Sequence, residues 1–200
     1  MSTRLSLLAA GLCLPIALAA QEAEAVKSVV LPTPEAQIAA AVLPLPEEFR
    51  ASATVLGYRV PGELVTLRQG TGAMICLADN PSEARFHVAC YQRDMEPFMA
   101  RGRALRAQGI TNVDSVRYAE VESGVLPMPN RAALWSLTGG PTSFDWATNT
   151  PDGTVRPLYV VYLPGATAES IGLPVTPGQN TPWLMFPGTP KAHIMFIPSM

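Results

Sequence analysis

Two stretches of sequence decide how this chain folds: Gly72-Ala73-Met74-Ile75-Cys76-Leu77-Ala78 and Arg85-Phe86-His87-Val88-Ala89-Cys90-Tyr91-Gln92. Both have the composition of β-strands, and the turn-rich residues 79–84 between them indicate a hairpin. A Cys76–Cys90 pair would set the register and leave one face wholly apolar, with Met74, Cys76, Ala78, Phe86, Val88 and Cys90. We therefore predict that this face lies in the core, because the alternation and the cysteine pair agree on one register.

The N-terminus predicts export. Residues 1–20 contain the parts of a secretory signal peptide in order: a basic Arg4, an apolar run at 5–14, and the small residues Ala17 and Ala19 on either side of Leu18. The apolar run is shorter than the roughly 20 residues that span a bilayer, and no later segment is long and apolar enough to do so. We expect a periplasmic or secreted protein without a transmembrane segment.

Export changes how the three cysteines are interpreted. Cys13 lies inside the predicted signal peptide, so the mature chain keeps Cys76 and Cys90. In an oxidising compartment such a pair predicts one disulfide bond. The basic residues are almost all arginine, with Lys27 and Lys191 the two lysines, and this bias favours a bacterial source.

Composition limits the fold class. The chain has 48% apolar and 15% charged residues, which excludes disorder for most of its length. Its 20 prolines and 15 glycines exclude coiled coils, helical solenoids and long helical bundles. We expect residues 21–32 to be a flexible lead-in and residues 33–200 to form a single compact α+β domain.

The remaining elements follow from local patterns. Thr33 and Pro34 predict the start of a short helix that ends by Pro44. Two helices are expected in the middle of the chain, at 94–108 with Asp94 as cap and at 111–123 with a Thr111–Asp114 capping box. Further strands are expected at 53–60, 64–67, 132–137, 158–163, 183–186 and 192–197. The prediction is a small, mainly antiparallel sheet with a Pro/Gly-rich C-terminal segment packed on it.

The two histidines are the weak candidates for chemistry. His193 and Met195 share one face of a strand-like run, with Met185 and Met200 nearby in sequence. Imidazole with thioethers suits Cu(I), so one hypothesis is copper binding through His193 and Met195. The alternative is a core strand in which methionines fill gaps and the histidine is hydrogen-bonded.

A hydrolase that uses His87 or His193 as general base is the alternative enzyme interpretation. The chain contains no Gly-x-Ser-x-Gly sequence, and a disulfide would consume both thiols that a cysteine nucleophile would need. The catalytic residues are therefore unknown, and no cofactor motif is present in the sequence.

Aromatic residues are the candidates for binding. Trp146 lies in a polar, turn-rich loop, Trp183 lies in the apolar C-terminal third, and Tyr91 lies on the hairpin. Loops on a rigid sheet often carry binding residues, although core packing explains such side chains as well.

The basic residues do not suggest nucleic acid as a partner. Arg93, Arg101, Arg103 and Arg106 do not form one continuous helical face, and the net charge is −2. We expect a non-catalytic binding or interaction protein whose partner is an unknown small molecule or an envelope protein.

Overall fold

The predicted hairpin forms with the expected register in the computed structural model of this chain. Strands β3 (Met74–Leu77) and β4 (Phe86–Gln92) are antiparallel, and Cys76 lies directly opposite Cys90. The two sulfur atoms are 2.07 Å apart and form the predicted disulfide. The structure describes residues 30–178 and 180–198, so the predicted signal peptide and most of the lead-in lie outside the described residues.

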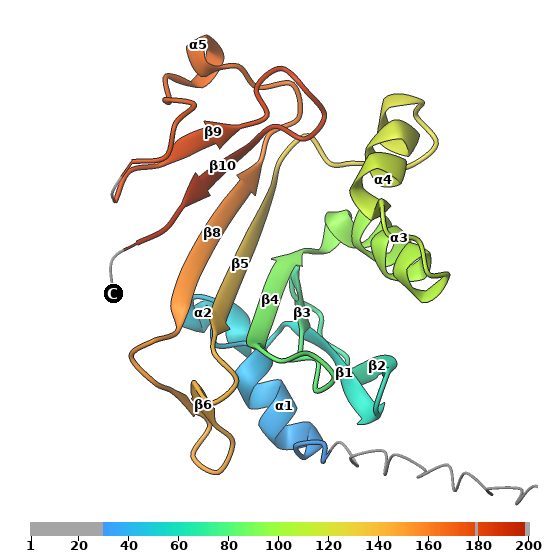
Figure 1. The fold of residues 1–200 in the computed structure, drawn as a ribbon, viewed down its shortest axis with the longest axis vertical. Coiled ribbons are helices and arrows are strands. Elements are labelled where there is room, and N and C mark those ends of the chain that lie inside the picture. The colour runs from blue at the N-terminus through green and yellow to red at the C-terminus, as the bar shows by residue number, and fades with distance from the viewer. Residues whose placement is uncertain (1–29, 179, 199–200) are drawn as a thin grey trace, which may run out of the picture.

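The hairpin lies within an eight-stranded sheet of order β2-β1-β3-β4-β5-β8-β10-β9 (Figure 1). The other strands are β1 (Thr54–Val60), β2 (Glu63–Arg68), β5 (Ala132–Gly139), β8 (Arg156–Tyr162), β9 (Trp183–Met185) and β10 (His193–Phe196). Strand β8 is central, as expected for a run that is apolar on both faces. The α+β class is confirmed, but the sheet is larger than the small one predicted, and the β1–β3 pair is parallel.

The face of the sheet that carries the disulfide is covered by the N-terminal helix α1 (Pro34–Ala41). Ala41 packs with Cys76, Cys90 and Val55 in one buried cluster, and Ala40 packs with Phe86 and Val88 in another. Thr33 accepts a hydrogen bond from the amide of Ala36, which caps the helix as its sequence predicts. The predicted core face of the hairpin is therefore confirmed.

The opposite face of the sheet packs against helices α3 (Glu96–Ala107) and α4 (Val113–Glu122), which Figure 1 shows beside the upper part of the sheet. Phe98 of α3 and Tyr118 of α4 join Ile75 and Tyr91 of the sheet in a third buried cluster. The two predicted mid-chain helices are confirmed.

The predicted caps of these two helices are wrong. A 3₁₀ turn, η1 (Arg93–Met95), precedes α3, and the side chain of Gln92 accepts from the amide of Asp94, so Asp94 does not cap the helix. Helix α4 follows Asn112 without a side-chain cap, and Asp114 instead forms an ion pair with Arg117. Neither acidic residue therefore caps its helix.

The Pro/Gly-rich C-terminal segment was expected to pack on the sheet. It instead extends the sheet at one edge. Strand β10 pairs with β8, and β9 pairs with β10 at the edge. Gly165 and Gly188 follow prolines and have positive φ angles of 81° and 73°, as the Pro-Gly turns predict. The short helix α5 (Ala168–Ile171) lies between these strands in the chain and carries a Thr167–Ser170 capping box.

Two elements escaped prediction. Helix α2 (Glu47–Arg50) begins directly after Pro46, and a separate two-stranded hairpin joins β6 (Phe144–Asp145) to β7 (Thr150–Pro151). The hairpin is held by Phe144, whose ring stacks on Phe86 with centroids 4.6 Å apart. Within the described residues, no helix has the length and apolar character needed to cross a membrane.

Candidate functional site

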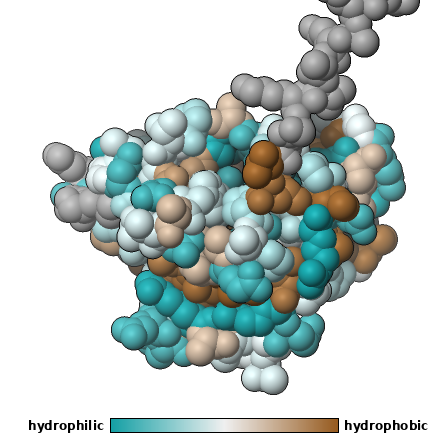
Figure 2. Space-filling model, turned by 90° about the horizontal axis from the view of Figure 1, so that it is seen from below, coloured by the Kyte–Doolittle hydropathy of each residue, from teal (hydrophilic) through white to brown (hydrophobic). Residues whose placement is uncertain are grey.

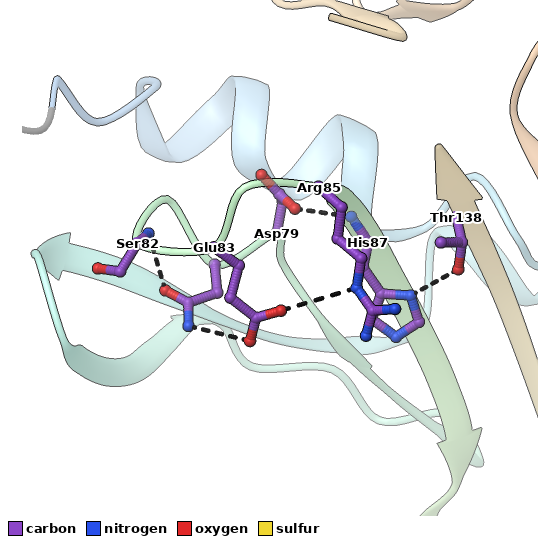
Figure 3. Close-up of polar contacts among 7 residues, drawn as sticks. Asp79, Ser82, Glu83, Arg85, His87 and Thr138 are labelled. Carbon is purple, nitrogen blue, oxygen red and sulfur yellow. Dashed lines mark hydrogen bonds and ion pairs between the residues drawn. The ribbon is translucent and has the colours of Figure 1, made fainter. Parts of the chain in front are cut away.

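His87 lies on β4, directly opposite Thr138 of β5. Its Nδ1 atom is 2.8 Å from Oγ1 of Thr138, so the imidazole and the hydroxyl form a cross-strand hydrogen bond (Figure 3). The pair is partly buried, and the two residues are 51 positions apart in the chain. An imidazole within hydrogen-bond distance of a hydroxyl is the first element of a nucleophile–base pair.

The loop before β4 surrounds this histidine with charged groups. Asp79 accepts the backbone N–H of His87 through Oδ1 at 2.7 Å. Glu83 pairs with Arg85 at 3.8 Å, and Figure 3 shows Arg85 beside the imidazole of His87. The turn itself is closed by Asn80, which accepts from the amide of Ser82 and donates to Glu83.

Burial and neighbouring groups shift the pKa values of His87 and Asp79. Burial lowers the pKa of His87, and the positive charge of Arg85 lowers it further. Burial also raises the pKa of the Asp79 carboxyl, against the stabilising hydrogen bond from the His87 amide. His87 is therefore a neutral imidazole near pH 7, which can accept a proton but does so weakly.

The two histidines do not meet. Both project from the face of the sheet that carries Tyr91. His87 lies opposite Thr138 of β5, whereas His193 lies opposite Tyr162 of β8, which itself lies opposite Ala132 of β5. Six residues along a strand correspond to about 20 Å. No single site can use both imidazoles, so each must be considered on its own.

His193 lies in a half-buried aromatic environment on β10. Its Nδ1 is 2.6 Å from the carbonyl oxygen of Lys191, and its ring is 5.3 Å from the Tyr162 ring and 5.7 Å from the Phe186 ring. Burial lowers the pKa of His193, against the hydrogen bond to Lys191. Met195 shares its face of the strand, while Met200 lies outside the described residues.

Trp146 lines an open groove of about 710 Å³ on the other side of the sheet. The groove lies between the start of α1 and the β6–β7 hairpin, and its lining comprises Leu31, Pro32, Thr33, Glu35, Ala36, Ala39, Trp146, Ala147 and Asn149. Figure 2, which views the molecule from below, shows hydrophobic side chains beside the start of the described chain, next to hydrophilic ones.

The indole of Trp146 is held in place by the aromatic residues beneath it. Its ring meets Phe144 at 4.7 Å and Phe86 at 6.1 Å between centroids, both at steep interplanar angles. Edge contacts of this kind leave Trp146 half-buried on a rigid support. Asn149, which the sequence did not single out, lines the same groove, has a φ of 55°, and has a buried Oδ1 without a hydrogen-bond partner.

The other two predicted binding residues lie in the core. Tyr91 is 1% exposed, and its hydroxyl donates to Glu96 and accepts from Arg103. Trp183 is 5% exposed, and its buried Nε1 has no hydrogen-bond partner among the described residues. The structure thus separates Tyr91 and Trp183, which are buried, from Trp146, which lines the groove beside the start of α1.

A second open groove, of about 690 Å³, lies at the start of β5 and the end of β8. The residues that line it include Asp94, Asn130, Arg131 and Val161. None of the sequence-predicted site residues borders it. In the described part of the chain, no three His, Cys, Asp or Glu side chains are grouped to hold a metal ion.

Comparison with known proteins leaves the site to be interpreted from its own chemistry. The chain matches no protein-family model, no curated protein and no solved structure.

Proposed function

We propose that this chain is an exported, non-catalytic binding protein of the periplasm or the extracellular space. Its ligand is a small organic cation with an apolar body, held in the groove beside Trp146. The observation that supports this proposal is the half-exposed indole, braced by Phe86 and Phe144 at the wall of a groove of about 710 Å³. A rigid aromatic side chain in a concave apolar lining is a common feature of small-molecule sites.

The charge of the lining favours a cation. Among the described residues that line the groove, one side chain is charged: Glu35, in the first turn of α1. Indole attracts cations more strongly than the other aromatic side chains do, so these groups favour a ligand with a positively charged N–H donor.

Export is supported by two features. The sequence predicts a signal peptide at residues 1–20, and Cys76 and Cys90 form a disulfide in the structure. Disulfides persist in oxidising compartments and are rare in the cytosol.

The experiment uses three probes of matched shape: benzylammonium, benzyl alcohol and benzoate. Each is titrated into the purified protein while the indole N–H resonances of its three tryptophans are recorded by NMR. We expect benzylammonium to shift the Trp146 resonance saturably and benzoate to leave it unchanged. Glu35→Gln should reduce the preference for benzylammonium over benzyl alcohol, because it removes the carboxylate, keeps the shape and leaves the attraction of the indole in place.

Trp146→Phe assigns the resonance, and Trp135→Phe is the matched control because Trp135 packs against Tyr159 away from the groove. Benzoate binding as tightly as benzylammonium would overturn the choice of a cation. A Trp146 resonance that none of the probes moves would overturn the site itself.

His87 and Thr138 support one alternative function, a hydrolase in which His87 takes the proton of the Thr138 hydroxyl. The 2.8 Å contact between Nδ1 and Oγ1 favours it, and the nearby Arg85, which lowers the pKa of His87, weakens it. The test is p-nitrophenyl acetate hydrolysis by the protein and by Thr138→Val and Thr138→Ser. Activity that Thr138→Val removes and Thr138→Ser retains would establish this alternative, and hydrolysis unaffected by Thr138→Val would exclude it.

A further inference from the structure

The edge of the sheet opposite β2 brings four side chains of related chemistry together. His193 lies directly opposite Met185, and Met195 lies directly opposite Trp183. Directly opposed residues of antiparallel strands share a face with Cβ atoms about 4.5–5.5 Å apart, and their diagonal neighbours are about 7–8 Å apart. One imidazole and two thioethers therefore occupy neighbouring positions on this face, beside the indole of Trp183.

His193 is arranged as a ligand would be. The carbonyl oxygen of Lys191, 2.6 Å from Nδ1, can only accept a hydrogen bond, so the proton of the neutral ring lies on Nδ1. The lone pair of Nε2 then remains available to a metal. This is the outer contact that metal-binding histidines commonly make, and it holds the ring in one tautomer and one orientation.

The surroundings select the class of metal. Thioether sulfur is a soft ligand that favours Cu(I), whereas carboxylates suit harder cations. Across residues 30–178 and 180–198, no three His, Cys, Asp or Glu side chains are grouped at a metal-binding distance, so a hard divalent ion has no comparable site there.

Charge and solvent access favour a single positive charge. The Nζ of Lys191 lies 4.9 Å from the Tyr118 ring centroid and 5.7 Å from that of Phe186, and Phe186 also borders His193. A divalent ion would be repelled more strongly by this ammonium group than a monovalent one. The rings of Tyr162 and Phe186 border His193, and Trp183 is buried, so the surroundings of the site are mainly aromatic, which suits ligands of low polarity.

We propose that His193, Met185 and Met195 form a binding site for Cu(I), with the indole of Trp183 beside the bound ion. The site lies on the opposite face of the sheet from Trp146 and is independent of the proposed cation-binding groove.

The test measures Cu(I) binding by competition with bicinchoninate in the presence of ascorbate, using the purified full-length mature protein. Ag(I), a soft monovalent ion that does not change oxidation state here, is titrated in parallel while the methionine methyl resonances are recorded by NMR. We expect one Cu(I) per protein, shifts confined to Met185 and Met195 with Ag(I), and no uptake of Zn(II). Met185→Leu and Met195→Leu should each weaken binding by about tenfold or more, since even outer contacts of metal ligands contribute 10–100-fold.

Met99→Leu is the matched control because Met99 lies on helix α3, where it packs against the buried Phe98–Tyr118 cluster, and not on strand β9 or β10. His193→Gln, which keeps a polar side chain on the strand, should abolish binding while the circular dichroism spectrum stays unchanged. The proposal is overturned if the protein takes up no Cu(I), if the Met185 and Met195 variants bind as tightly as Met99→Leu, or if Zn(II) competes equally.

Discussion

The hydroxyl of Tyr91 lies 2.5 Å from Oε2 of Glu96, and this contact ties the central strand β4 to the first turn of α3. Arg103, two turns further along the same helix, donates to the Tyr91 hydroxyl at 3.1 Å and to Oε1 of Glu96 at 2.5 Å. Tyr91 is 1% exposed, so Glu96 and Arg103, and not bulk water, satisfy the hydrogen bonds of its hydroxyl. The three groups join the hairpin to the helical layer.

Tyr91→Phe should lower the free energy of unfolding by about 1–2 kcal/mol, because it removes one partner from a hydrogen-bonded group that includes charges. This loss is at the lower end of the free energies typical of hydrogen bonds to charged groups. The side chains of Glu96 and Arg103 are 34% and 26% exposed, so water can replace the hydroxyl as their partner. Urea unfolding followed by circular dichroism measures it. Tyr159→Phe is the control, since among the described residues the Tyr159 ring makes aromatic contacts and its hydroxyl makes no hydrogen bond. Equal losses in the two variants would contradict the assigned role.

The sequence predicted the parts of this fold in which local pattern and long-range pairing agree. The hairpin register followed from the alternation around Cys76 and Cys90, because a shift by one residue would have exposed the entire apolar face. Helix α3 followed from the spacing of Met95, Phe98 and Leu105, all of which are buried.

Features that depend on distant partners could not be predicted. Arg117 of α4, which pairs with Asp114 in its own helix, also places its guanidinium over the Phe98 ring of α3. The β6–β7 hairpin has strands of two residues, and stacking of Phe144 on Phe86 holds it against the sheet. A pattern within one segment contains no information on such contacts.

The candidate sites show the same limit. The sequence placed His193 and Met195 on one face but could not place Met185 there, because that needs the β9–β10 register. The Pro187-Gly188 turn between these strands was the available signal for a hairpin. Trp146 was selected as a loop aromatic, whereas Asn149, which shares its groove, carried no distinguishing pattern.

Removing the disulfide should destabilise the protein by about 3 kcal/mol, because the bridge closes a loop of about 15 residues in the unfolded chain. The comparison is between the protein and a Cys76→Ala/Cys90→Ala variant, each unfolded thermally with and without a reductant. The variant should unfold at a lower temperature that the reductant does not change. If a reductant leaves the unfolding temperature of the unmodified protein unchanged, the bridge is absent or contributes nothing to stability.

Acidification should destabilise the protein through its two histidines. Burial lowers the pKa of both His87 and His193 below the ordinary value of about 6.5. Below that value the unfolded chain binds more protons than the folded one, so stability is full above about pH 6.5 and is lost as the pH falls through the folded pKa values. Urea unfolding between about pH 7.5 and pH 5 should show this decline, and a His87→Gln/His193→Gln variant should show a flatter profile.

Asp79 acts in the opposite direction and must be separated from this effect. Its pKa is raised by burial, so its contribution to stability falls as the pH rises through its titration. Both proteins are therefore compared in an Asp79→Asn background, in which the side-chain oxygen can still accept the His87 amide. Identical pH profiles with and without the histidines would show that burial does not penalise their charged forms.

Gly102 allows α3 and α4 to approach each other closely. A Cβ atom at this position would lie 2.8 Å from a terminal guanidinium nitrogen of Arg117 and 3.1 Å from its Cζ. Arg117 is 8% exposed, and its guanidinium lies 4.1 Å from the centre of the Phe98 ring, so it cannot move aside without losing that contact. Gly102→Ala should therefore destabilise the protein by about 1–3 kcal/mol through overpacking, although alanine is favoured over glycine in a helix by about 1 kcal/mol.

A double-mutant cycle separates these two effects, because Arg117→Ala removes the atoms that the new methyl group would meet. In that background Gly102→Ala should stabilise the protein by about 0.5–1 kcal/mol, since the preference for alanine is then unopposed. Urea unfolding of the protein, both single variants and the double variant gives the coupling free energy. Destabilisation of equal size in both backgrounds would show that the Gly102–Arg117 approach does not limit the packing of α3 on α4, and that the backbone at Gly102 requires glycine for another reason.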